Sequence, residues 1–427
     1  MRIALTNEFF PPAAPGGAEW SMFELAQTLS EAGHHVVVIT PNYGHSAYEL
    51  EGKVAIYRYA FPRKLKSERQ LPGFIWYSNP FFYLYSAIQI YRIARKEKLQ
   101  LIHAQNKYSL PGSWLAARAL GIPVVTTIRD TSHICRIAVC LLKHDQVPSD
   151  CGMTKLLREC SEEYYKDYYP KKSVYLHLKD KIWQVYHWWD AHFRRFFLNS
   201  SDAVVSVSNA LLEIYKNSRT IRSEKVHSQA VYNIARVMQN SKSRNIREQY
   251  DLGDSPIVLF AGKFSKGKGS DDFVEAAEQL YRSGIKATFI LLGSGKSILK
   301  SDAIKTFSQL SHNETLQFIS ESSVIVVPSV WPEPLSRVIL ESLSFGKPIV
   351  GTRVGGTPEA VIDGFNGFLV PKNDPAAIVN AIEKILRDAE LSARMSRNSL
   401  RMAQETFGQA IICNQVEKLY QKCVGHK

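Results

Sequence analysis

The chain has 427 residues, enough for two or three domains that each bury a core, and its hydrophobic content of 45% is typical of a globular protein. A formal net charge of +13 favours phosphate-bearing partners or an anionic membrane, but no helix-turn-helix, zinc-finger or RNA-recognition pattern points to nucleic acid. No run of about 20 apolar residues predicts a membrane span, and the first residues predict a strand rather than a signal peptide, so we expect a cytoplasmic protein.

The N-terminal part of the chain alternates strand and helix patterns. Residues 2–6 and 35–40 predict strands, and an amphipathic helix ending near Glu31 lies between them. This order predicts a parallel sheet. Gly16 and Gly17 stand at the start of the helix, where glycine lets backbone amides approach an anion closely, although such a pair is by itself more often a turn.

Residues 63–98 combine aromatic and basic side chains. The aromatic residues crowd the stretch 71–91, and basic residues lie on both sides of it. This composition is typical of a segment that lies on an anionic membrane, but a helix packed inside the first domain would also show it. We therefore expect either a packed helix or a peripheral membrane contact near an acceptor site.

Further strands are predicted at 101–105, 124–128 and 203–208, and the third is expected to be the last strand of the first domain. Asp130 follows the second of these strands. Its carboxylate could contact a substrate, or it could cap the end of the strand.

Four of the six cysteines fall in one window after Asp130, namely Cys135, Cys140, Cys151 and Cys160. Their spacing lacks the close C-x-x-C pairs of a zinc ribbon. Free thiols in a reducing cytosol are therefore favoured over a disulfide or a metal site.

A polar stretch at 239–245 is typical of a linker, and a second domain is expected to follow it. Its first strand, at 257–261, runs into a basic loop that contains Lys263 and Lys268. Two cations that converge on a diphosphate would neutralise charge on a leaving group, although a solvated basic loop would look the same. A lysine interacts with phosphate as a point charge, without the fork of an arginine.

Another predicted strand, at 288–292, ends in three small residues, Gly293, Ser294 and Gly295. We expect these residues to form a turn that can face a nucleotide.

The stretch from residue 328 to residue 359 carries the strongest signal. An apolar strand leads into it, and Pro334 marks the first turn of a predicted helix. Glu333 and Glu341 bracket this helix, about 12 Å apart along its axis. They could bind hydroxyl groups, or they could be a helix cap and a solvated surface residue.

The amides of Leu335 and Ser336 lie between these carboxylates, at the positive end of the helix dipole. Such an end readily accepts phosphate. The order of groups that this arrangement would bind is a sugar, a diphosphate and a ribose.

Two segments of this stretch, E-P-L-S-R-V-I-L-E-S and G-K-P-I-V-G-T-R-V-G-G-T-P-E, resemble the retaining glycosyltransferases of family 4, which are related to glycogen synthase. The resemblance implies an α/β fold of the GT-B type, with two doubly wound Rossmann-like domains, a cleft between them and a C-terminal crossover helix. The implied parts are an acceptor-binding domain at 1–235, a nucleotide-sugar-binding domain at 236–406, and a helix at 407–427 that returns to the first domain.

The resemblance implies transfer of a sugar from a nucleoside-diphosphate sugar to a hydroxyl group of a glycan or lipid-linked glycan in cell-surface polysaccharide synthesis. It implies no cofactor and no metal. The implied catalytic residues are Glu333, Lys268, Lys263 and Asp130. The implied donor-binding residues are Gly16, Gly17, Lys263, Lys268, Gly293, Ser294, Gly295, Glu333, Leu335, Ser336 and Glu341.

The chain departs from the family pattern where many members have histidine, because it has Gln105 and Arg129 there. No catalytic histidine is therefore expected. A phosphorylase-like enzyme, a non-catalytic sugar-nucleotide-binding or scaffold protein, and a nucleic-acid-binding protein stay as alternatives. The expected location is cytoplasmic, with or without contact to the inner face of the plasma membrane.

Overall fold

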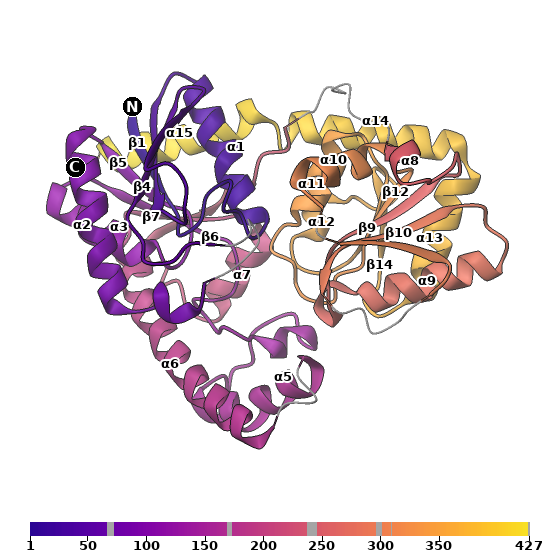
Figure 1. The fold of residues 1–427 in the computed structure, drawn as a ribbon, viewed down its shortest axis with the longest axis horizontal. Helices are drawn as coiled ribbons and strands as arrows, with labels where there is room; N and C mark the ends of the chain where they lie inside the picture. Colours follow the sequence, from indigo (N-terminus) through magenta and orange to yellow (C-terminus); the bar gives the residue numbers. More distant parts are fainter. Residues whose placement is uncertain (66–71, 169–172, 237–245, 296–300, 309, 426–427) are drawn as a thin grey trace. The chain divides into compact units, whose positions relative to one another are not determined.

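The computed structural model describes the chain except for residues 66–71, 169–172, 237–245, 296–300, 309 and 426–427 (Figure 1). The predicted linker at 239–245 lies outside the described residues. The chain forms two compact units. Unit 1 comprises Met1–Asn233 with Ile412–Lys427, and unit 2 comprises Ile234–Ile411.

Unit 1 is built on an eight-stranded sheet with the strand order β3-β4-β2-β1-β5-β6-β7-β8. All neighbouring strands are parallel except β3, which pairs antiparallel with β4. The strands are β1 (Arg2–Thr6), β2 (His35–Pro41), β3 (Tyr48–Glu51), β4 (Val54–Tyr59), β5 (Leu101–Ala104), β6 (Val124–Ile128), β7 (Ala203–Ser206) and β8 (His227–Ala230). The prediction that 203–208 is the last strand of this unit is wrong. The polar edge strand β8 follows it and lacks an apolar pattern that could reveal it.

The helices of unit 1 include the aromatic-rich segment. They are α1 (Gly17–Glu31), α2 (Pro80–Lys96), α3 (Leu110–Leu120), α4 (Met153–Lys155), α5 (Ser161–Tyr168), α6 (Val174–Asn199) and α7 (Asn209–Asn217), with the short helices η1 (Phe74–Trp76), η2 (Val139–Leu142) and η3 (Leu156–Cys160). From Ile412 onward, the C-terminal helix α15 (Gln409–Gly425) also belongs to this unit.

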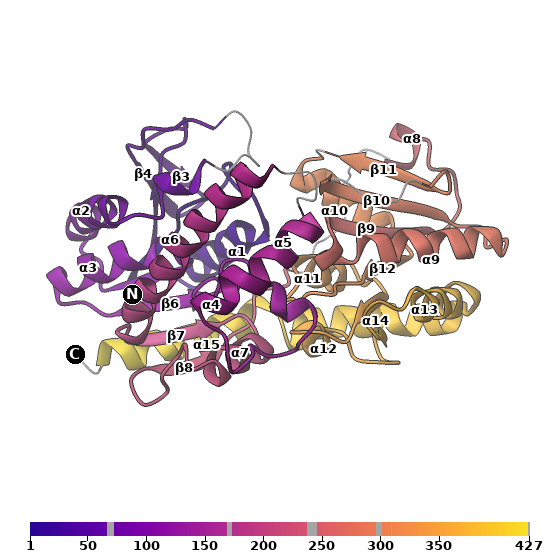
Figure 2. The same cartoon turned by 90° about the horizontal axis from the view of Figure 1, so that it is seen from below.

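Helix α2 lies side by side with α3 (Figures 1 and 2). Asn79 caps α2 by accepting a hydrogen bond from the amide of Phe82 at 2.8 Å. A Cβ added at Gly112 of α3 would lie 2.2 Å from Ser86 Oγ of α2, so only glycine permits this approach. The predicted packing inside the first domain is therefore confirmed for one face of α2.

Unit 2 contains a six-stranded parallel sheet with the order β11-β10-β9-β12-β13-β14. Its strands are β9 (Ile257–Phe264), β10 (Thr288–Gly295), β11 (Ile304–Ser308), β12 (Val324–Val327), β13 (Ile349–Thr352) and β14 (Gly367–Val370). Its helices are α8 (Ile246–Gln249), η4 (Lys266–Lys268), α9 (Ser270–Arg282), α10 (His312–Glu321), α11 (Arg337–Ser344), α12 (Thr357–Ala360), α13 (Pro375–Arg387) and α14 (Ala389–Glu405).

Both sheets reverse their strand order at one point, as doubly wound nucleotide-binding folds do. In unit 2 this point lies between β9 and β12, and in unit 1 it lies between β1 and β5. The predicted pair of doubly wound Rossmann-like domains is therefore confirmed. None of the helices in the described part of the chain has the length and apolar character needed to cross a bilayer.

Candidate donor-binding site

The strand order of unit 2 reverses between β9 and β12, so the chain leaves the carboxyl ends of these two strands toward opposite sides of the sheet. Ligands of open α/β sheets bind at such points. Helix η4 follows β9, and a loop from Pro328 to Ser336 follows β12. The predicted residues Lys268 and Glu333 lie on these two segments.

Backbone hydrogen bonds join the turn at η4 to the loop that follows β12. The amides of Val330 and Trp331 donate to the carbonyl oxygen of Gly267 at 3.1 and 3.0 Å. Gly269 has a φ of +65°, and a Cβ there would lie 1.9 Å from the carbonyl oxygen of Pro328. The close approach of the two loops therefore depends on glycine at this position.

Lys268 Nζ forms an ion pair with Glu333 Oε2. The side chain of Glu333 is only 12% exposed, whereas that of Lys268 is 37% exposed. The amide of Gly356 donates to the carbonyl oxygen of Glu333 at 2.7 Å, which fixes the backbone beneath the carboxylate. The pair places a carboxylate, which can accept hydrogen bonds from hydroxyl groups, beside a cation, which can attract a phosphate.

Helix α11 begins at Arg337, so the prediction that Pro334 opens its first turn is wrong. The residues between Glu333 and the helix are not helical, and the backbone of Glu333 is hydrogen-bonded to the loop after β13. Leu335 and Ser336 are buried, and Ser336 is the N-cap residue.

Glu341 lies inside α11 and is held by a basic neighbour that the sequence analysis did not select. Arg337 Nε donates to Glu341 Oε1 at 2.8 Å, and His312 Nε2 lies 3.6 Å from the same oxygen. The spacing of four residues between Arg337 and Glu341 could have revealed this pair. No direct contact with the Lys268–Glu333 pair is recorded for Glu341 within the described residues.

Lys263 and the three small residues lie on paired strands. Lys263 of β9 is exposed and stands opposite Ser294 of β10. Gly293, Ser294 and Gly295 are the last residues of β10, so the prediction that they form a turn is wrong. A Cβ at Gly293 would lie 1.7 Å from the carbonyl oxygen of Gly262. The close packing of β9 and β10 therefore requires glycine at this position.

Gly16, Gly17 and Asp130 belong to unit 1. Gly16 is the N-cap residue of α1, and its amide donates to Glu19 Oε2 at 3.0 Å. A carboxylate of the chain thus already occupies this helix end. Gly17 is the first residue of the helix.

Asp130 lies just beyond β6 and pairs with Lys107 at 2.6 Å, a residue that no sequence pattern selected. The amide of Ser132 donates to Asp130 Oδ1 at 2.9 Å. Burial alone would raise the pKa of Asp130, but Lys107 and Ser132 together hold that pKa below its ordinary value. The carboxylate is therefore ionised and held in one orientation.

Arg129 and Gln105, which stand at the family's histidine positions, contact each other. Arg129 Nε donates to the carbonyl oxygen of Gln105 at 3.0 Å, and Arg129 Nη1 donates to Asn233 Oδ1 at 2.8 Å. A fixed positive charge thus takes the place of an imidazole at the end of β6.

Two sequence families match the chain. Residues 15–228 match Glycosyltransferase Family 4, and residues 242–402 match Glycosyl transferases group 1. The chain belongs to glycosyltransferase family 4.

Relatives of this family-4 chain include N-acetyl-alpha-D-glucosaminyl L-malate synthase of Bacillus anthracis, which is 23% identical over 98% of the chain and 97% of that protein. Alpha-D-kanosaminyltransferase of Streptomyces kanamyceticus is 26% identical over 53% of the chain, a match that spans 62% of that protein. Among solved structures, Anabaena Alr3699/HepE in complex with UDP-glucose superposes with a TM-score of 0.66 at 18% identity, over 99% of this chain and 100% of that one. This likeness confirms the GT-B fold.

Proposed function

We propose that this family-4 glycosyltransferase moves a sugar, with retention of its anomeric configuration, from a nucleoside-diphosphate sugar to an acceptor hydroxyl. The observation that carries the proposal is the Lys268–Glu333 pair at the switch point of unit 2. The acceptor in this proposal is a glycan or a lipid-linked glycan of a cell-surface polysaccharide. The complex of HepE with UDP-glucose supports a nucleotide sugar as the donor.

In the proposed reaction, the bond from the sugar's anomeric carbon to the diphosphate breaks. The acceptor oxygen forms its bond on the same face, and the departing diphosphate takes the acceptor's proton. Lys268 and Lys263 offset the charge that grows on the diphosphate, with the amides of Leu335 and Ser336. Glu333 binds hydroxyl groups of the donor sugar.

The remaining contacts complete the donor site in this proposal. Glu341, oriented by Arg337, binds the ribose. Gly293, Ser294 and Gly295 line the nucleotide end. Asp130, ionised beside Lys107, orients donor or acceptor. No metal or other cofactor is required, because lysines and backbone amides supply the positive charge.

Turnover of Lys268→Ala and Glu333→Ala tests the assignment. We expect each to lose at least tenfold in turnover, about 1.4 kcal/mol or more of transition-state stabilisation. Lys266→Ala is the matched control, since it removes a cation from the same short helix outside the pair. Full activity in both test variants would refute the assignment.

Two further measurements separate the alternatives. A thermal-shift screen of nucleotide sugars identifies the donor, because a bound donor raises stability. The anomeric configuration of the product, determined by NMR, tests retention. A donor that binds without being transferred to any acceptor, or hydrolysed, would instead favour a non-catalytic sugar-nucleotide-binding protein.

We also propose that an apolar face of unit 1 meets an anionic membrane on the cytoplasmic side. Phe81 and Leu84 of α2 are 86% and 59% exposed, and a groove of about 990 Å³ opens between the start of α2 and α6. The exposed Arg92 and Arg95 lie farther along α2. Apolar side chains next to basic ones favour an anionic bilayer surface.

Flotation with liposomes tests this contact. We expect the chain to float with anionic vesicles at low salt, and Phe81→Ser with Leu84→Ser to abolish flotation while folding is preserved. Tyr281→Ser, which changes an exposed aromatic residue of unit 2, is the control. A chain that fails to float at low salt would refute the membrane contact but leave the transfer reaction untouched.

A further inference from the structure

The four clustered cysteines of unit 1 surround a single cavity. Cys135, Cys140, Cys151 and Cys160 come from four separate turns of the segment between β6 and α5, and all four line a cavity of about 90 Å³. The four cysteine side chains therefore gather around the same space. None of the four forms a disulfide.

Two uncommon backbone conformations lie beside the cavity. Ala138 adopts a left-handed conformation with a φ of +38°, and its amide lies 3.5 Å from Cys135 Sγ as a donor. Cys160 ends the helix η3, a π-helical turn. Non-glycine residues in this conformation and π-helical turns are uncommon and cluster at functional sites.

The charges that line the cavity are positive. Arg195 and Lys155 contribute to its wall, and no Asp or Glu is among the lining residues that the structure describes, although Lys155 also pairs with Asp150 at 2.6 Å. Four thiolates gathered at one point would repel one another. A guest that carries positive metal ions, with Arg195 and Lys155 around it, would relieve this repulsion.

The four cysteine side chains are not arranged around one metal ion. Nowhere in the described part of the chain do three His, Cys, Asp or Glu side chains approach closely enough to hold a single ion. The cavity, at about 90 Å³, leaves room for a guest larger than a single ion. Four thiolates spread around a polynuclear guest are the ligand set of a cubane iron–sulfur cluster.

We propose that Cys135, Cys140, Cys151 and Cys160 bind one [4Fe–4S] cluster. The covalent step is ligand exchange from a preassembled cluster that carries small thiolates. Each cysteine forms one Fe–S bond and gives its proton to the small thiolate that leaves, so no electron is transferred. The inference is independent of the proposed transfer reaction.

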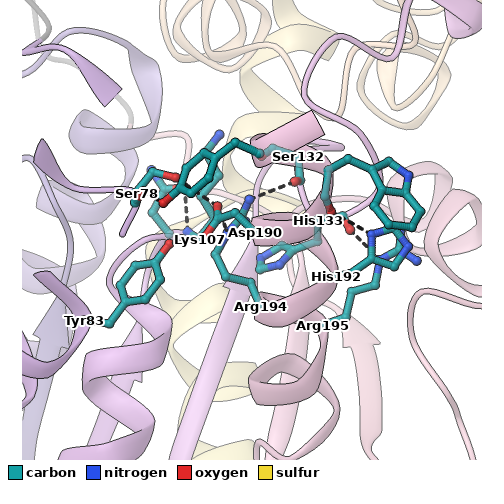
Figure 3. Close-up of polar contacts among 12 residues, drawn as sticks. Ser78, Tyr83, Lys107, Ser132, His133, Asp190, His192, Arg194 and Arg195 are labelled. Carbon is teal, nitrogen blue, oxygen red and sulfur yellow. Dashed lines mark hydrogen bonds and ion pairs between the residues drawn. The ribbon is translucent and has the colours of Figure 1, made fainter. Parts of the chain in front are cut away.

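The cluster would fix the segment that follows Asp130. Helix α6 already holds the start of this segment, because Arg195 donates to the carbonyl oxygens of His133 and Ile134 at 2.7 and 3.0 Å (Figure 3). Arg194 donates to the carbonyl oxygen of Ser132 at 3.2 Å (Figure 3). The cluster would hold the part of the segment that follows Ile134. Its role would therefore be to position this loop rather than to react.

Metal and sulfide analysis of the full chain, purified without oxygen, tests the proposal. We expect about four iron and four sulfide per chain, with the broad visible absorbance of a thiolate-bound cluster. Protein isolated without the cluster should acquire it from a synthetic [4Fe–4S] cluster with small thiolate ligands.

Substitutions assign the ligands. Cys140→Ser and Cys160→Ser should each lose most of the iron and the absorbance, whereas Cys413→Ser and Cys423→Ser in α15 should keep both. Analysis of the unsubstituted chain decides the matter even if a variant does not fold. Zinc in place of iron, disulfides, or four thiols that remain metal-free after treatment with the synthetic cluster would overturn the proposal.

Discussion

Two glycines of unit 2 share one backbone conformation but have different surroundings. Gly269 and Gly253 have φ values of +65° and +64°, so alanine at either position costs about 1–2 kcal/mol of left-handed strain. A Cβ at Gly253 meets open space, whereas one at Gly269 would collide with the backbone of Pro328. The difference between the two substitutions therefore isolates the contact between the loops after β9 and β12.

We expect Gly269→Ala to lower the unfolding temperature more than Gly253→Ala does. It should also weaken the thermal shift produced by the donor, because the collision displaces the loop that carries Lys268. Thermal unfolding with and without donor measures both effects. Equal donor shifts in the two variants would contradict the role assigned to this contact.

Glu8 is a buried carboxylate outside the proposed donor contacts. Burial raises its pKa from 4.5 to about 7. Between about pH 4.5 and pH 7 the folded chain therefore binds a proton that the unfolded chain has released. The contribution of Glu8 to the free energy of unfolding must fall as pH rises through this window.

We expect Glu8→Gln to gain stability relative to the unsubstituted chain when the pH is raised from 5 to 8. Urea denaturation of both proteins at the two pH values measures this, and the difference between them removes the effect of other titrating groups. A difference in stability that is the same at both pH values would show that the carboxylate is not held protonated.

The sequence predicted that Glu333 and Lys268 belong to one donor site, but not the ion pair between them. The two residues are 65 positions apart, and they meet only because β9 and β12 are neighbours in the sheet. The Arg337–Glu341 pair lies within one helix and was open to prediction from its spacing. Ion pairs within one helix can thus be predicted from sequence spacing. Ion pairs between loops of neighbouring strands can be predicted only when the strand order is known.

At the scale of elements, the contact between α2 and α3 depends on one glycine. Alanine at Gly112 would place its Cβ 2.2 Å from Ser86 Oγ and 3.1 Å from the amide nitrogen of Ala87. Overpacking of this kind costs about 1–3 kcal/mol.

We therefore expect Gly112→Ala to lower the free energy of unfolding by about that amount. Adding Ser86→Ala should recover part of the loss, because it removes Ser86 Oγ, the nearest of the obstructing atoms. A double-mutant cycle by chemical denaturation measures the coupling. Strict additivity would indicate that the helices separate for another reason.

The elements that sequence predicted best are the buried strands. The first four residues of β9 and all of β12 are apolar and buried, so their pattern is strong. The edge strand β8 has polar residues and was missed. The start of α11 was misplaced because contacts with the loop after β13, rather than local propensity, decide it.

At the scale of the whole molecule, both ends of the chain contribute to unit 1. Helix α15 buries Leu419 and Tyr420 there, and Tyr420 OH lies 2.6 Å from His103 Nδ1 of β5. Leu419→Ala should therefore cost about 2–5 kcal/mol. The neighbouring exposed Lys418→Ala should change stability by less than about 0.5 kcal/mol.

Hydrogen exchange can locate the loss that Leu419→Ala causes. We expect faster exchange in β1 and β5, and unchanged exchange in β9 and β12, because Leu419 belongs to the core of unit 1. Equal acceleration in both sheets would contradict the assignment of Leu419 to the core of unit 1.

The membership of α15 in unit 1 has a consequence for biosynthesis. The ribosome completes Met1–Asn233 first and then makes all of Ile234–Ile411 before the final helix emerges. At about 5–20 residues per second, this delay lasts roughly 10–35 seconds. Throughout it, the nascent first unit presents the bare surface that α15 later covers, which makes this surface a natural target for chaperones that guard growing polypeptides.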